Sequence, residues 1–162
     1  GQVESAQGTK VVVDATITDA PDLDILLVPG GIGTREQVRN ETVLDWLRNQ
    51  AETVEWLTSV CTGSGLLAKA GVLDGYKATS NKFSFDWVTK QGPDVDWVYE
   101  ARWVEDRNRM TSSGVSAGMD MSLALLDRLY GEETADMVAK FTEYSCSKDP
   151  GIDPFAAYFR KK

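Results

Sequence analysis

The stretch that decides the fold is V-E-W-L-T-S-V at positions 54–60, which runs directly into C-T-G-S-G at positions 61–65. The first seven residues predict a strand, and the leucines and alanines after the turn predict a helix that Gly71 ends. A strand that passes directly into a helix makes a tight turn, of the kind that exposes the nucleophile of G-x-S-x-G enzymes. Cys61 stands at the tip of this turn, so we expect any chemistry of the chain to depend on it.

A second glycine-rich turn follows a second apolar strand. D-I-L-L-V at positions 24–28 suits a strand that is covered on both faces of a parallel sheet, and P-G-G-I-G at positions 29–33 breaks it. Strands that alternate with helices predict an α/β fold, a three-layer sandwich with a mostly parallel sheet. Sites in such folds lie beyond the carboxyl ends of the strands, so both turns are expected to open on the same edge.

The remaining pattern predicts the other elements. Asn40 is expected to cap a helix over 41–51, and Ser116 a longer helix with an inward apolar stripe. No repeat or linker divides the chain, so residues 1–162 are expected to form one domain. The inward stripes of the last two helices are expected to consist of Met119, Leu123, Leu126 and Tyr130, and of Val138, Phe141 and Tyr144. The other expected elements are a strand or strand pair over 10–17, strands over 76–79, 98–104 and 109–112, helices over 83–90 and 132–144, and an irregular tail over 149–155.

Composition limits the classes of partner. The 162 residues include 17 basic and 25 acidic side chains, which gives a net charge of −8. Such an acidic balance argues against nucleic acid and anionic membrane surfaces as partners, and no apolar run approaches the roughly 20 residues that span a membrane. The two cysteines, Cys61 and Cys146, have the spacing of neither a metal site nor a disulfide framework. A cytoplasmic protein without a metal or other cofactor is therefore expected.

The chain contains no histidine, which excludes a Ser-His-Asp or Cys-His arrangement within it. Activation of Cys61 is therefore expected from the following helix, whose N-terminal N–H groups and partial positive charge favour a thiolate. Backbone N–H groups of Gly31, Ile32 and Thr62 are expected to form an anion hole, and the Thr62 hydroxyl to orient a water or a substrate nitrogen. The alternative is an inert cysteine packed at a strand end. Cys146 is interpreted as an ordinary helix-end residue.

V-C-T-G-S at positions 60–64 resembles the ThiJ/PfpI superfamily, which has the class I glutamine amidotransferase-like fold. Three further stretches resemble it in the same order: D-I-L-L-V-P-G-G-I-G at 24–33, A-G-V-L-D-G-Y-K-A-T at 70–79 and S-G-V-S-A-G-M-D at 113–120. The resemblance extends over residues 10–156 and implies a flavodoxin-like fold with a nucleophile elbow at Cys61. Within the superfamily the chain is most similar to the isonitrile hydratase branch, whose pattern also occurs in sensor domains of AraC-type regulators.

This resemblance implies a homodimer that acts on a small molecule through Cys61. In the hydratase branch the thiolate attacks the terminal carbon of an R–N≡C group, and water then releases an N-substituted formamide with the help of Thr62. The superfamily's first strand and helix have no counterpart here, nor has the acidic residue that bonds to the cysteine sulfur. A separate N-terminal segment is therefore an expected partner. Asp120 is expected in the first turn of its helix, where carboxylates are favoured.

Position 81 separates the possible functions. Many relatives have histidine where this chain has Asn81, and an amide cannot act as a base near pH 7. Gly30 and Asn81 are expected to line the pocket, although Asn81 could instead cap a helix. Hydration of an isonitrile is the favoured function. A non-enzymatic redox or ligand sensor, in which Cys61 is oxidised or simply lines a pocket, is the second. A glyoxalase- or deglycase-like activity, which needs a proton shuttle, is the third.

Overall fold

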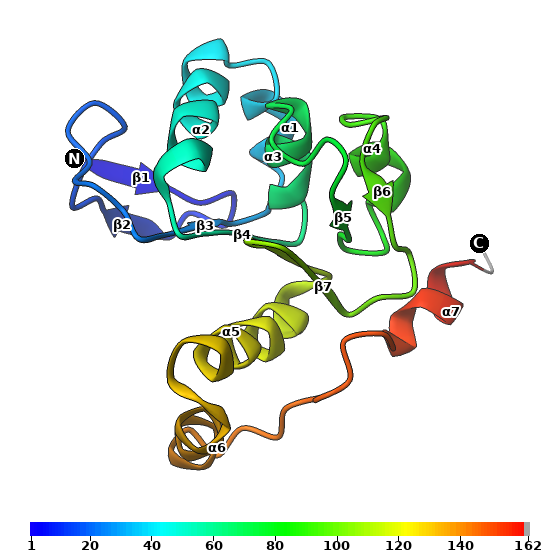
Figure 1. Ribbon diagram of the computed structural model, residues 1–162. Helices are drawn as coiled ribbons and strands as arrows, with labels where there is room; N and C mark the ends of the chain where they lie inside the picture. The colour runs from blue at the N-terminus through cyan, green and yellow to red at the C-terminus, as the bar shows by residue number, and fades with distance from the viewer. Residues whose placement is uncertain (161–162) are drawn as a thin grey trace.

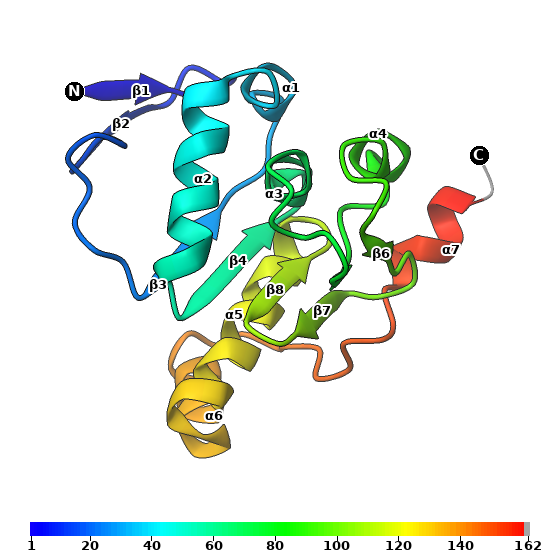
Figure 2. The same cartoon turned by 45° about the horizontal axis from the view of Figure 1, so that its top comes forward.

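Four strands form the central sheet, in the spatial order β3-β4-β8-β7 (Figure 2). They span Ile25–Val28, Trp56–Val60, Arg109–Ser112 and Trp103–Asp106 in that order. The structure is a computed structural model that describes residues 1–160. β3, β4 and β8 are parallel, and β7 pairs antiparallel with β8 across a short turn. The mostly parallel sheet predicted from the two buried strands and their turns is confirmed.

One face of the sheet is covered by the helices that follow β3 and β4 (Figure 1). These are α1 (Thr34–Gln37), α2 (Glu41–Thr53) and α3 (Gly63–Lys69). A further helix, α4 (Phe85–Thr89), comes later in the chain and packs on α3. The predicted cap of α2 is confirmed, because the Asn40 side chain accepts a hydrogen bond from the Val43 N–H.

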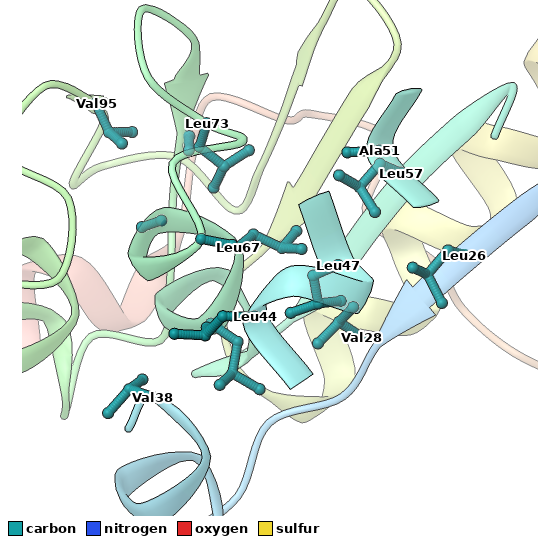
Figure 3. Packing of buried hydrophobic residues seen from close by; sticks show 14 of the residues in the cluster. Leu26, Val28, Val38, Leu44, Leu47, Ala51, Leu57, Leu67, Leu73 and Val95 are labelled. Atoms are coloured by element: carbon teal, nitrogen blue, oxygen red, sulfur yellow. The ribbon is translucent and has the colours of Figure 1, made fainter. Parts of the chain in front are cut away.

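The larger core lies between the sheet and this first layer of helices. Leu57 of β4, Leu44 of α2 and Leu67 of α3 are all fully buried, and each contributes about 1.5–3 kcal/mol through removal from water. Figure 3 shows that their side chains converge between the strands and the helices. The labelled members are Leu26, Val28, Val38, Leu44, Leu47, Ala51, Leu57, Leu67, Leu73 and Val95. This core fixes the ends of β3 and β4 relative to each other.

The opposite face is covered by α5 (Val115–Tyr130), beyond which α6 (Glu132–Phe141) packs on α5 (Figures 1 and 2). The chain then returns along the sheet and ends in α7 (Pro154–Arg160), beside the end of the molecule that holds α4. The three layers match the predicted α/β sandwich. The tail predicted to be irregular contains the start of α7.

The predicted inward stripes of the last two helices are confirmed only in part: four members, Leu123, Leu126, Val138 and Tyr144, are half-buried, and the other three are exposed. Met119, Tyr130 and Phe141 are 48%, 68% and 89% exposed. Most of the fully buried positions are instead small residues, and the whole set is Ala117, Gly118, Asp120, Met121, Ala135 and Ala139. A Cβ on Gly118 would be 2.8 Å from a methyl carbon of Val60, so α5 approaches β4 through its smallest side chains. The N-cap of α5 is Gly114 rather than Ser116.

Two small sheets stand outside the central one. β1 (Gln2–Glu4) and β2 (Lys10–Val12) form an exposed antiparallel hairpin, and β5 (Lys77–Ala78) pairs in parallel with β6 (Asp96–Trp97). The strand expected over 10–17 therefore ends at residue 12, before a turn in which the Thr16 N–H donates to the Asp19 carboxylate. The strand expected over 98–104 begins only at Trp103, the first residue of β7.

Candidate active site at the Cys61 turn

Cys61 lies between the end of β4 and the start of α3 with a φ of +59°. This left-handed conformation is rare for residues other than glycine and persists only where the surroundings enforce it. The Cys61 N–H donates to the carbonyls of Ser112 and Ser113, at 3.2 and 2.9 Å. Its own carbonyl accepts hydrogen bonds from the hydroxyls of Ser64 and Ser80, at 3.1 and 2.8 Å. The predicted strand–turn–helix at Cys61 is thus present, with both backbone groups of Cys61 held.

The two glycine-rich turns meet, as expected for strands whose carboxyl ends share one edge. A Cβ on Gly30 would be 2.7 Å from the Thr62 nitrogen and 2.8 Å from the Cys61 Cβ. A Cβ on Gly63 would be 2.1 Å from the Val28 carbonyl oxygen. Only glycine allows this approach at either position, so the glycines are needed to bring the β3 turn against the cysteine.

The Thr62 hydroxyl joins the two turns. Thr62 is 5% exposed, and its Oγ1 accepts a hydrogen bond from the Gly31 N–H at 3.0 Å. The Thr34 hydroxyl lies 2.8 Å from the Gly31 carbonyl oxygen and 3.1 Å from the Thr62 Oγ1. One of the three predicted anion-hole donors, Gly31, therefore has a partner within the chain, and the Ile32 side chain is exposed. The anion hole stays a prediction.

Asn81 bonds to local backbone. Its Oδ1 accepts a hydrogen bond from the Ser84 N–H at 3.3 Å, just before α4 begins at Phe85. The N-cap of α4 is Ser84, so Asn81 supports the turn before the helix and is not its cap, the alternative role considered for it. Its role in lining a pocket, like that of Gly30, stays a prediction.

Three hydroxyl side chains that the sequence did not single out support the turn. Ser64 and Ser80 are fully buried and bond to the Cys61 carbonyl, and buried Thr34 contacts Thr62. Ser64 is part of the quoted C-T-G-S stretch, and Ser80 follows a predicted strand that ends near the same edge. Position after a strand was therefore the only available signal for Ser80.

Asp120 is not in the first turn of its helix, as its motif suggested. α5 begins at Val115, and the Asp120 carboxylate is buried in an ion pair with Arg102 at 2.5 Å. Its other oxygen accepts hydrogen bonds from the Tyr144 hydroxyl and the Ser147 N–H, both at 3.0 Å. Asp120 thus anchors the segment after α6 rather than a helix end.

Cys146 lies in that anchored segment, five residues beyond the end of α6, so it is not a helix-end residue. It lines a cavity of about 360 Å³ between α5, α6 and the segment, together with Trp103, Asp127 and Lys148. Within residues 1–160 no group of His, Cys, Asp and Glu side chains could hold a metal ion. No helix of the same residues is long and apolar enough to cross a membrane.

Comparison with known proteins identifies the family. Residues 1–128 match the DJ-1/PfpI family. The chain belongs to the DJ-1/PfpI family. It is 38% identical over 145 residues to an isonitrile hydratase of Pseudomonas putida, a match that covers 88% of this chain and 61% of that protein. It is 36% identical over 143 residues to the HTH-type transcriptional regulator GbdR of Pseudomonas aeruginosa, over 88% of this chain and 38% of the regulator.

Solved structures of the DJ-1/PfpI family agree with the fold. A THiJ/PfpI family protein from Pseudomonas syringae superposes with a TM-score of 0.82 at 34% identity, over 91% of this chain and 60% of that one. DJ-1beta of Drosophila melanogaster superposes with a TM-score of 0.74 at 25% identity, over 89% and 77%. The chain spans less than two thirds of the length of the Pseudomonas putida hydratase and of the Pseudomonas aeruginosa regulator. The flavodoxin-like fold expected from the quoted motifs is confirmed.

Proposed function

We propose that this DJ-1/PfpI domain hydrates a small isonitrile to an N-substituted formamide, with the Cys61 thiolate as nucleophile. The observation that carries the proposal is the left-handed Cys61 at the β4–α3 turn, with the Gly30 turn packed against it. The 38% identity to an isonitrile hydratase supports the choice of substrate class. The absence of histidine agrees with a reaction in which no imidazole base is needed.

The proposed reaction regenerates the Cys61 thiolate at its end. The sulfur of Cys61 attacks the terminal carbon of R–N≡C, and that carbon takes up a proton to give a thioimidate, R–N=CH–S–Cys. Water then adds to the same carbon, the carbon–sulfur bond breaks, and R–NH–CHO leaves with release of a proton and the Cys61 thiolate. The net reaction is the addition of one water to the isonitrile.

Thr62 has a positioning role in this proposal. Its hydroxyl already bonds to Gly31 and Thr34, so it holds the β3 turn beside the sulfur. A hydroxyl in this place can also orient the attacking water or the substrate nitrogen. Removal of the hydroxyl would break its hydrogen bonds to Gly31 and Thr34, each worth about 0.5–1.5 kcal/mol.

The test is incubation of the chain with cyclohexyl isocyanide and detection of N-cyclohexylformamide by gas chromatography. We expect product from the unaltered chain and from Cys146→Ser, the matched control. Cys61→Ser should make none, and Thr62→Val should be slower. Product formation that survives Cys61→Ser, or no product from the folded unaltered chain, would contradict the proposal.

A ligand or redox sensor is the second candidate. The similarity to HTH-type regulators supports it, because a domain of this kind is present in proteins named as regulators. Mild peroxide treatment followed by mass spectrometry tests the redox form, which predicts that Cys61 is oxidised before Cys146. Oxidation of Cys146 before Cys61 would exclude the redox sensor. The glyoxalase-like alternative remains third, since no histidine can act as its proton shuttle.

We further propose that β3 is completed by another strand, from a separate segment or a second copy of the chain. In the described residues β3 pairs only with β4, and its Ile25 and Leu27 side chains are 39% and 47% exposed. Exposed apolar edge strands readily pair with further strands. For a homodimer, light scattering should give twice the 17.8 kDa mass of one chain. A measured mass of one chain would contradict the homodimer.

A further inference from the structure

Lys82 and Asp153 form a buried ion pair away from the cysteine itself. Lys82 Nζ lies 3.4 Å from Asp153 Oδ2, and both side chains are 1% exposed. The same ammonium donates to the carbonyls of Ala101 and Ser80, at 2.7 and 3.2 Å, and to the Thr79 hydroxyl at 3.2 Å. The ammonium thus joins Asp153 to the turn over 79–82 and to Ala101.

A pair this deeply buried needs an explanation beyond stability. Burial lowers the pKa of Lys82, and the Asp153 carboxylate opposes that shift. Removing two charges from water is costly, so a buried ion pair is weak evidence for a stabilising role. The arrangement that the pair specifies is the more informative feature.

Ser80 connects this pair to the candidate site. The Ser80 carbonyl accepts from Lys82, while the Ser80 hydroxyl donates to the Cys61 carbonyl at 2.8 Å. The left-handed conformation of Cys61, with a φ of +59°, persists only where its surroundings enforce it, and the Ser80 hydrogen bond is one of these restraints. One ion pair and two hydrogen bonds therefore join Asp153 to the Cys61 backbone.

Asp153 comes from the segment that leads into α7. Its N–H donates to the Glu100 carbonyl at 2.9 Å, and its Oδ1 accepts from the Phe155 N–H at 3.1 Å. The ion pair thus fastens the C-terminal segment to the turn that supports the cysteine.

We propose that Lys82 and Asp153 are positioning residues for Cys61: through Ser80 they hold the cysteine turn in its left-handed conformation. The proposal rests on the proposed role of Cys61 as nucleophile. The proposal gives the segment before α7 a role in the site, although that segment is far from Cys61 in the sequence.

The experiment measures the rate of Cys61 alkylation by iodoacetamide at pH 7, in a Cys146→Ser background so that only one thiol reacts. Lys82→Met, Asp153→Asn and Ser80→Ala should each slow alkylation about threefold to tenfold, the loss expected when one or two positioning hydrogen bonds disappear. The matched control is Arg160→Met on the same C-terminal segment. It breaks an exposed pair with Glu100 and should leave the rate unchanged.

The double variant Lys82→Met/Asp153→Asn separates positioning from stability. Each single variant leaves a buried charge or an orphaned partner, whereas the double variant removes both charges. Its urea midpoint should therefore recover toward that of the unaltered chain while alkylation stays slow. A rate that recovers with the midpoint would overturn the proposal, since the pair would then act through stability alone.

Ser80→Ala keeps the ion pair intact, so the proposal can still be tested with it if the single charge variants do not fold. Unchanged or faster alkylation of Ser80→Ala would overturn the proposal by itself. Alkylation needs no isonitrile, so a failed hydration assay leaves this test decisive. Slow alkylation of the variants beside a chain that makes no formamide would sustain the positioning role and reject the hydratase function.

Discussion

Cys61 and Cys146 are both half-buried thiols, yet the chain around them is built in different ways. The constraints on Cys61 act on its backbone: two glycines allow another turn to pack against it, and four hydrogen bonds hold its N–H and carbonyl. Cys146 lies in an irregular segment that side chains anchor, chiefly the buried Asp120. The position of the Cys61 thiol is therefore set by its own backbone conformation. The position of the Cys146 thiol depends instead on the contacts of neighbouring residues with Asp120.

The largest expected effect is at Gly63, beside Cys61. Gly63→Ala would place a Cβ 2.1 Å from the Val28 carbonyl oxygen, so the chain would have to separate the two turns. We expect a loss of about 4 kcal/mol or more in the free energy of unfolding, measured in urea. Gly151→Ala, in the segment after Cys146, is the control. Its Cβ would be 3.4 Å from the flexible Asp149 carboxylate, and we expect a change within about 0.5 kcal/mol. Equal losses of stability in the two variants would show that the Cys61 turn is no more constrained than the segment after Cys146.

The next effect concerns the anchor of the Cys146 segment. Asp120→Ala would leave Arg102 buried without its carboxylate, at a cost of about 3 kcal/mol. It would also release the Tyr144 hydroxyl and the Ser147 N–H, so labelling of Cys146 should become faster while labelling of Cys61 does not. Faster labelling at both cysteines would show that the two regions are not independent.

The smallest effect is at Tyr144, which bonds to the same anchor. Tyr144→Phe should cost about 1 kcal/mol at pH 7, the value of one hydrogen bond. Burial raises the pKa of Tyr144, and the hydrogen bond to Asp120 and its charge raise it further. The folded chain therefore keeps this proton where the unfolded chain, with a pKa of about 10, loses it. The contribution is complete below pH 10 and is lost as pH rises through the folded pKa.

Urea titrations at pH 8 and pH 10.5 measure this difference. The unaltered chain should lose more stability between the two pH values than Tyr144→Phe does. An identical loss in both proteins would show that Tyr144 does not titrate differently in the folded state.

The sequence allowed prediction of the features that depend on local backbone. The strand before Cys61, its turn and the helix start were predictable because the glycines have no other use there than turn geometry and close approach. The same reasoning placed the glycine-rich turn at positions 29–33 on the same edge of the sheet as the cysteine turn. These signals lie within a few residues of the feature that they predict.

The sequence did not allow prediction of contacts between distant residues. The stripe on α5 was misassigned at Met119, because Gly118 and Ala117 bring that helix close to β4 while the larger Met119 is exposed. No local pattern pairs Lys82 with Asp153 or Arg102 with Asp120, since each pair joins separate elements. Ser80 was likewise visible only after the fold had brought it to Cys61.

The most direct test of the account is a competition between the two thiols in the unaltered chain. Limiting iodoacetamide at pH 7, followed by proteolysis and mass spectrometry, gives the rate of modification of each cysteine. We expect Cys61 to react at least about tenfold faster than Cys146, because Cys61 stands at a tight strand-to-helix turn of the kind that exposes a nucleophile. Equal rates, or faster modification of Cys146, would contradict the claim that the Cys61 turn is the reactive centre.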